Sequence, residues 1–139
     1  MALTLLTKFR HQLEPVKDQA YLKYFRDTYC IVDGVQIYDP HHIMGSTFGM
    51  KFTDYLLVKA SREMHNKWQR DLPKYFDLLL QPAVENLIIY AKENGVIKLQ
   101  SDLKYYRNNW DNPLALNILF DLLKKERGDR YVFGKSYSG

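Results

Sequence analysis

The stretch CIVDGVQIY, residues 30–38, constrains the fold more than any other part of this sequence. Asp33-Gly34 is a favoured pair for a two-residue type I′ turn, because both turn positions need a positive φ. β-branched and aromatic residues flank the pair on both sides, which is typical of strands. We therefore predict a β-hairpin, with the next segment, DPHHI (39–43), at the end of its second strand.

Helical patterns surround this hairpin. Pro15 predicts the end of a first helix, Asp18 and Ser61 are of the residue types that cap helices, and Pro82 predicts a kink in a long helix that Gly95 ends. The segment between the hairpin and Ser61 reads as a glycine-containing loop followed by a short apolar run. The predicted helices cover residues 2–14, a segment after Asp18, a segment from Ser61, residues 73–94 and residues 111–128.

The chain has 139 residues and 46% hydrophobic content, which is enough to bury a core without disulfides. We expect a single domain over residues 1–139 with an α+β fold. A hairpin-loop-helix module would cover 18–70, a helical extension 71–128 and a loose tail 129–139.

Composition excludes several classes of function. The single cysteine, Cys30, excludes an intramolecular disulfide and a Cys-rich zinc site, and its place on a predicted strand indicates a buried, unreactive thiol. No segment approaches the roughly 20 apolar residues of a membrane span, and the N-terminal apolar run is too short for a signal peptide, so we expect a cytoplasmic protein. Phosphate-binding and dinucleotide-binding glycine motifs are absent from the sequence.

Three of the four histidines, His41, His42 and His65, fall close to the hairpin and the helix that follows it. A strand-end pair and a helical histidine can converge on one divalent cation that keeps positions open for phosphate and water. An imidazole outside the ligand set can act as a general base, because its pKa lies near neutrality. The alternative is that these are ordinary surface histidines.

Residues 20–70 also resemble a known family. The pattern YLKYFRDTYCIVDG, DPHHI, GMKFTD and LLVKASREMH is similar to the HNH (ββα-metal) nucleases of the phage type, and especially to the RecA-dependent Ref nucleases and their prophage relatives. These proteins carry Cys-x-x-Cys-Gly, then Pro-His-His, then Gly-x-Lys-x-x-Asp, and finally helical histidines.

The resemblance implies a role for each matching residue. His41 and His65 would bind the metal, and His42 would be the general base. Gln69, four residues after His65, takes the place of the family's last histidine and could offer a carbonyl oxygen to a hard cation. The catalytic loop would also contain Lys51 and Asp54, as an orienting pair.

The family's structural zinc site is missing. At its four ligand positions this chain has Cys30, Asp33, Ser61 and Met64, which cannot form a tetrahedral zinc site. We therefore expect no structural zinc, and a catalytic cation that is Mg²⁺ or Mn²⁺ rather than Zn²⁺.

Basic residues follow the predicted site, and the net charge of the chain is +4. Phosphate contacts could come from them, although on their own they are better explained by a solvated surface. KYYRNNW (104–110) could stack on bases or simply pack in the core, and Arg127, Arg130 and Lys135 could add non-specific affinity for DNA. The residues nearest the site are Lys59, Arg62, Lys67 and Arg70.

These observations predict a metal-dependent endonuclease of phage or prophage type that hydrolyses DNA, located in the host cytoplasm if phage-encoded. The alternative is a non-catalytic DNA-binding or protein-binding accessory derived from such a nuclease. It would serve as a recombination factor that partners a recombinase, or as an inhibitor of a host defence protein. A homodimer formed by the helical C-terminal half is a further possibility.

Overall fold

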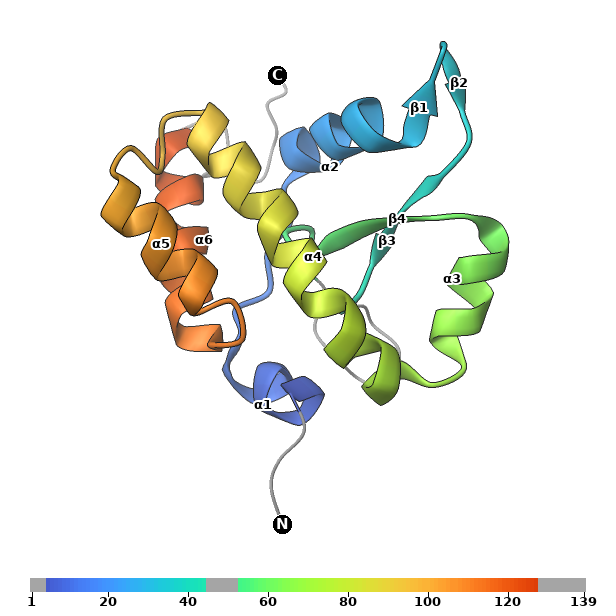
Figure 1. The fold of residues 1–139 in the computed structure, drawn as a ribbon, viewed down its shortest axis with the longest axis horizontal. Coiled ribbons are helices and arrows are strands. Elements are labelled where there is room, and N and C mark those ends of the chain that lie inside the picture. The colour runs from blue at the N-terminus through green and yellow to red at the C-terminus, as the bar shows by residue number, and fades with distance from the viewer. Residues whose placement is uncertain (1–4, 45–52, 128–139) are drawn as a thin grey trace.

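The computed structural model describes residues 5–44 and 53–127, which combine helices with small antiparallel sheets (Figure 1). The helices are α1 (Leu5–Gln12), α2 (Gln19–Phe25), a π-helical turn η1 (Arg26–Cys30), α3 (Arg62–Gln69), α4 (Leu72–Glu93), α5 (Gln100–Asn108) and α6 (Pro113–Arg127). The strands are β1 (Ile31–Val32), β2 (Val35–Gln36), β3 (Asp39–His42) and β4 (Leu57–Ala60). The predicted α+β class is therefore confirmed at this coarse level.

The predicted hairpin is present as β1 and β2. Val32 pairs with Val35 across the turn, where Asp33 and Gly34 have φ values of 52° and 80°. Positive φ at both positions is the requirement of a type I′ turn, so local chemistry alone closes this hairpin. It projects from the body of the molecule beside α2 (Figure 1).

A second sheet was not predicted. DPHHI was predicted to lie at the end of the second strand of the hairpin. Its first four residues instead form the separate strand β3. This strand pairs antiparallel with β4, so that His41 lies opposite Val58 and His42 opposite Leu57. The apolar run after the glycine-containing loop is thus a strand, and the histidine pair lies within a sheet. Residues 45–52, the middle of that loop, fall outside the described part of the chain.

Side-chain caps start the helices where the sequence indicates. Asp18 Oδ1 accepts a hydrogen bond from the Tyr21 backbone N–H at 2.8 Å, and Ser61 Oγ accepts one from the Met64 N–H at 3.1 Å. Helix α4 continues through Pro82 to Glu93 and is followed by Gly95 at φ 74°.

Helix α5 was missed by the sequence prediction. It contains the first part of KYYRNNW and turns only Leu103 and Tyr106 into the core. A short helix with so few apolar positions has a weak periodic signal, and its formation depends on packing against α4 and α6.

Helix α4 organises the molecule. It crosses the middle of the fold, with α5 and α6 on one side and the β3–β4 sheet and α3 on the other (Figure 1). The buried side chains form one cluster that includes residues from α1, α2, β4, α4 and α6. Burial raises the pKa of the Cys30 thiol within this cluster, and the nearby Asp39 raises it further. Among the described helices, none has both the length and the apolar character needed to cross a lipid bilayer.

Asn117 on α6 connects the two ends of the chain. Its Oδ1 accepts a hydrogen bond from the Glu14 backbone N–H at 2.9 Å, and its Nδ2 donates to the Gln12 carbonyl at 2.8 Å. A single side-chain amide thus provides hydrogen-bond partners for two backbone groups at and just beyond the end of α1, where the helix itself offers none.

We predict that Asn117→Ala lowers the free energy of unfolding by about 1–3 kcal/mol, because it leaves a donor and an acceptor without partners. Chemical denaturation measures this change. Asn109→Ala is the matched control, since its Nδ2 bonds only the Tyr105 carbonyl of its own helix and is exposed. Equal effects of the two substitutions would contradict the assigned role of Asn117.

Candidate functional site

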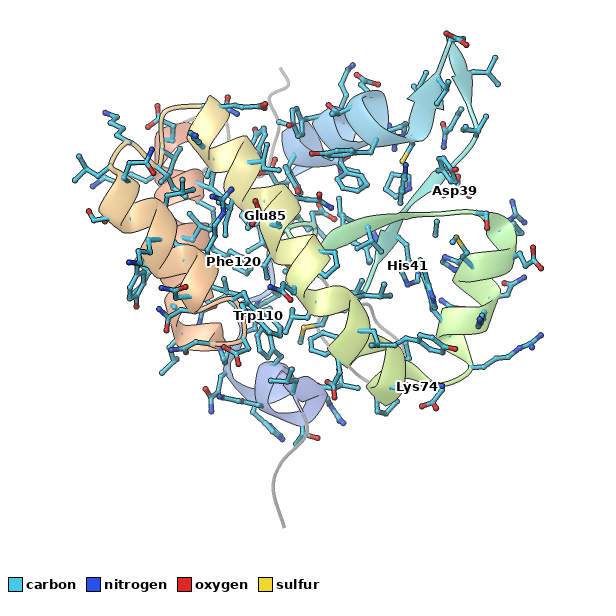
Figure 2. The ribbon with its side chains drawn as sticks, in the orientation of Figure 1. Asp39, His41, Lys74, Glu85, Trp110 and Phe120 are labelled. Carbon is cyan, nitrogen blue, oxygen red and sulfur yellow. The ribbon has the colours of Figure 1, made fainter. Side chains whose placement is uncertain are left out.

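The three clustered histidines lie on two elements that the β3–β4 sheet holds together. His41 and His42 occupy the last two positions of β3, and His65 lies on α3, which begins immediately after β4 and packs against it. Adjacent strand residues point to opposite faces, so His41 and His42 leave the sheet in different directions. Figure 2 shows His41 in the space between the sheet and α3.

The structure brings His41 and His65 into direct contact. Their Nδ1 atoms are 2.8 Å apart, and the ring centroids are 4.6 Å apart with the rings nearly perpendicular. The Trp68 ring of α3 lies 5.3 Å from the His41 ring and covers it. His41 is only 3% exposed, so this contact is a buried polar interaction rather than a chance meeting of surface side chains.

Burial determines the protonation state of His41. Its pKa is lowered from 6.5 to about 4, first by desolvation and then by the neighbouring His65 and His42. His41 is therefore neutral near pH 7, which leaves one nitrogen as a donor and the other as an acceptor or metal ligand. In the present contact one Nδ1 donates and the other accepts.

His42 makes a second, separate interaction with a carboxylate. Its Nε2 lies 2.8 Å from Asp54 Oδ1, and Asp54 Oδ2 accepts a hydrogen bond from the Asp18 backbone N–H at 2.7 Å. The Asp54 backbone N–H in turn donates to the Val16 carbonyl at 2.9 Å. Asp54 is 1% exposed, and these three interactions fix both of its carboxylate oxygens and its backbone amide.

This arrangement orients the His42 ring. A donor on Nε2 facing Asp54 fixes the tautomer in which Nδ1 carries the basic lone pair. The Lys51-x-x-Asp54 pattern anticipated an orienting role for Asp54, whereas Asp18 was expected only to cap a helix.

Gln69, which was expected to be a metal ligand, is exposed at the last position of α3, four residues after His65. Lys51 lies outside the described residues. Within residues 5–44 and 53–127, no group of three or more His, Cys, Asp or Glu side chains is placed to hold a metal ion.

The basic residues near the site are exposed. Lys59 lies opposite Pro40 in the sheet and therefore on the same face as His42, with its Nζ 4.7 Å from the Tyr38 ring centroid. The remaining three follow along or just after α3: Arg62, Lys67 and Arg70. Their positions suit contacts with a polyanion, and equally suit a solvated helix surface.

KYYRNNW has no part in this site. Its segment belongs to α5 and the turn after it, across α4 from the histidines (Figure 1). Tyr106 is buried, and the Arg107 guanidinium makes two hydrogen bonds to Glu85 of α4 at 3.1 and 2.6 Å. Of the two interpretations of this motif, the contacts of Tyr106 and Arg107 favour packing.

Three of the four positions at which the family has structural zinc ligands have other roles here. Cys30 is buried in the core, Asp33 forms the hairpin turn and Ser61 caps α3. Met64 is 45% exposed.

The chain matches no known family profile, no curated protein and no solved structure.

Because His41 is buried and neutral, we expect the free energy of unfolding to depend on pH. The unfolded chain takes up a proton near pH 6.5, whereas the folded protein resists it down to about pH 4, so the free energy of unfolding falls as the pH drops through this interval. For protein in EDTA we expect a loss of about 2 kcal/mol between pH 7 and pH 5 from this residue.

Urea denaturation at the two pH values measures this loss. His41→Gln removes the titrating group and should flatten the pH dependence, whereas His11→Ala, at an exposed position of α1, should leave it as in the wild type. The assignment would be wrong if the His41→Gln variant lost as much stability as the wild type.

Proposed function

We propose that this protein is a divalent-metal-dependent DNA endonuclease of the HNH type, with the β3–β4–α3 unit as its ββα-metal module. One observation carries the proposal: the Nδ1 atoms of His41 and His65 lie 2.8 Å apart, and His42, the residue after His41, is oriented by the buried Asp54 carboxylate. A strand pair followed by a helix is also the element order that the family name describes.

The donor pair suits one cation. Two nitrogens bound at about 2.1 Å to the same ion are about 3.0–3.4 Å apart for angles between 90° and the tetrahedral value, so a small separation of the rings makes room. Both side chains can supply neutral imidazole, the form that binds metal. When bound, a divalent cation would stabilise the negative charge that develops on a phosphodiester during hydrolysis. Imidazole is a ligand typical of transition metals, so of the two expected cations Mn²⁺ suits this pair better than Mg²⁺.

His42 is the proposed general base. With its ring oriented by Asp54, His42 would take the proton from the attacking water, and Asp54 would stabilise the imidazolium that results. The water oxygen forms the new bond to phosphorus while the bond to the leaving 3′ oxygen breaks.

The β3 strand explains how one phosphate can reach both groups. His41 and His42 project from opposite faces, but both faces end at the edge of β3 that faces away from β4. A phosphodiester lying across that edge would meet the His41–His65 pair on one side and His42 on the other. Lys59, on the His42 face, would then contact a neighbouring phosphate.

The second candidate is the non-catalytic accessory that binds DNA or a protein. The exposure of Gln69 favours it, together with the absence of a third His, Cys, Asp or Glu ligand among the described residues. In that case the His41–His65 contact would be a structural hydrogen bond between β3 and α3.

We predict that the purified protein nicks plasmid or cleaves single-stranded DNA with Mg²⁺, Mn²⁺ or Zn²⁺, and that His42→Ala lowers the rate by at least about 10²-fold. His11→Ala is the matched control, because it removes the one histidine that lies away from the site. Asp54→Asn should lower the rate without abolishing it, since the amide no longer stabilises the imidazolium. Absence of cleavage with every metal, or equal cleavage by His42→Ala, would overturn the nuclease proposal and favour the accessory.

Gln69→His tests the metal site itself. Histidines four residues apart share one face of a helix, so the substitution places a third imidazole beside His65. We expect Mn²⁺ and Zn²⁺ to bind at least about tenfold more tightly, as measured by calorimetry and by the change in Trp68 fluorescence. The same change in a His65→Ala background should give no such gain; an equal gain there would contradict a site centred on His65.

A further inference from the structure

Helix α6 is apolar on both of its faces. Its inner face, formed by Leu116, Leu119, Phe120 and Leu123, is buried in the core. Its outer face exposes Leu114, Ile118 and Leu122 at 59%, 51% and 40%. An exposed apolar stripe on a helix surface is typical of an interaction site.

The exposed residues form a continuous stripe. Spacing of i, i+4 and i+8 places Leu114, Ile118 and Leu122 in one ridge along the helix. The ridge is symmetric in residue type, because a leucine lies one turn before Ile118 and another lies one turn after it. Such a ridge can pack against a second copy of itself, with Ile118 at the centre.

Charge is complementary in the same register. If two α6 helices cross antiparallel with a two-fold axis at Ile118, Leu114 meets the partner's Leu122. Lys125 on α6 and Asp111 in the turn before it lie seven residues from Ile118 in opposite directions, so each lysine lies on the same side as the aspartate of the other copy. Both residues are exposed, and within the described part of the chain neither takes part in a salt bridge.

A hollow at one end of the stripe offers a place for the partner's side chain. A cavity of about 500 Å³ lies between the turn after α4 and the last turns of α6, and Leu99 and Leu122 are part of its wall. Leu99 is itself 62% exposed. In the antiparallel register, Leu114 of the other copy points at Leu122 and so towards this cavity.

We propose that the protein forms a symmetric homodimer through the α6 stripe of Leu114, Ile118 and Leu122, with the helices crossing at about −50° as is usual for ridges of this spacing. The interface lies across α4 from the His41–His65 pair (Figure 1), so it is independent of the proposed nuclease activity. Three apolar side chains from each copy are few for a permanent dimer, so the dimer should dissociate on dilution.

Sedimentation of the full chain over about a hundredfold range of concentration tests the proposal. We expect a monomer–dimer equilibrium, and Ile118→Glu should raise the dissociation constant at least about tenfold, because it places two carboxylates together on the axis. Leu78→Glu is the matched control: it charges an equally exposed leucine on α4, outside the stripe, and should leave the equilibrium unchanged. Thermal melts establish that both variants fold.

The position of the axis has its own test. Ile118→Lys should also be monomeric, but an equimolar mixture of Ile118→Glu and Ile118→Lys should form a heterodimer through a direct ion pair. A wild-type chain that stays monomeric at every concentration overturns the proposal. So does a dimer that Ile118→Glu leaves intact, and a mixture that fails to associate overturns the register centred on Ile118.

Discussion

The burial of Asp54 is the constraint on which the arrangement of the site depends. A carboxylate removed from water is costly unless its oxygens have partners. Here the partners come from two distant segments: the His42 ring from β3 and the Asp18 N–H from the start of α2. The Val16 carbonyl adds a third link by accepting the Asp54 N–H. The hydrogen bonds of Asp54 therefore fix the positions of the N-terminal segment, strand β3 and the end of the loop relative to one another.

The sheet that carries the histidines depends on helices in turn. A two-stranded pair of this length is not stable by itself in water, and it gains stability by packing against the helices. Leu57, Val58 and Ala60 of β4 are buried, and Asn86 of α4 donates a hydrogen bond to the Leu57 carbonyl at 3.1 Å. On the face that carries His41 and Val58, the His41–His65 contact ties α3 to the same strand pair. A polar contact proposed for metal binding is thus also part of what positions α3.

The proposed metal and base residues lie on the β3–β4–α3 side of α4, and the apolar stripe lies on α6, on the opposite side. A dimer through α6 would leave the β3–β4–α3 side of each copy uncovered by its partner and would place two such units on one assembly. For a DNA-binding protein, two linked sites raise the effective affinity for a long polyanion without any new contact at either site.

What the sequence by itself determined is the local structure. The Asp33-Gly34 turn, the Asp18 and Ser61 caps and the stop at Gly95 follow from the backbone preferences of single residues, so they can be predicted from their neighbours alone. Tertiary structure decided the rest. The β3–β4 pairing, helix α5 and the hydrogen bond from Asp18 to Asp54, 36 residues apart, depend on which buried surfaces and polar groups meet, which no local pattern specifies. For the same reason, residue type and the resemblance to a family could predict only that His41, His42 and His65 are candidate site residues. Packing between β3 and α3 decided that two of them touch, and the burial of Asp54 beside β3 decided that the third faces a carboxylate.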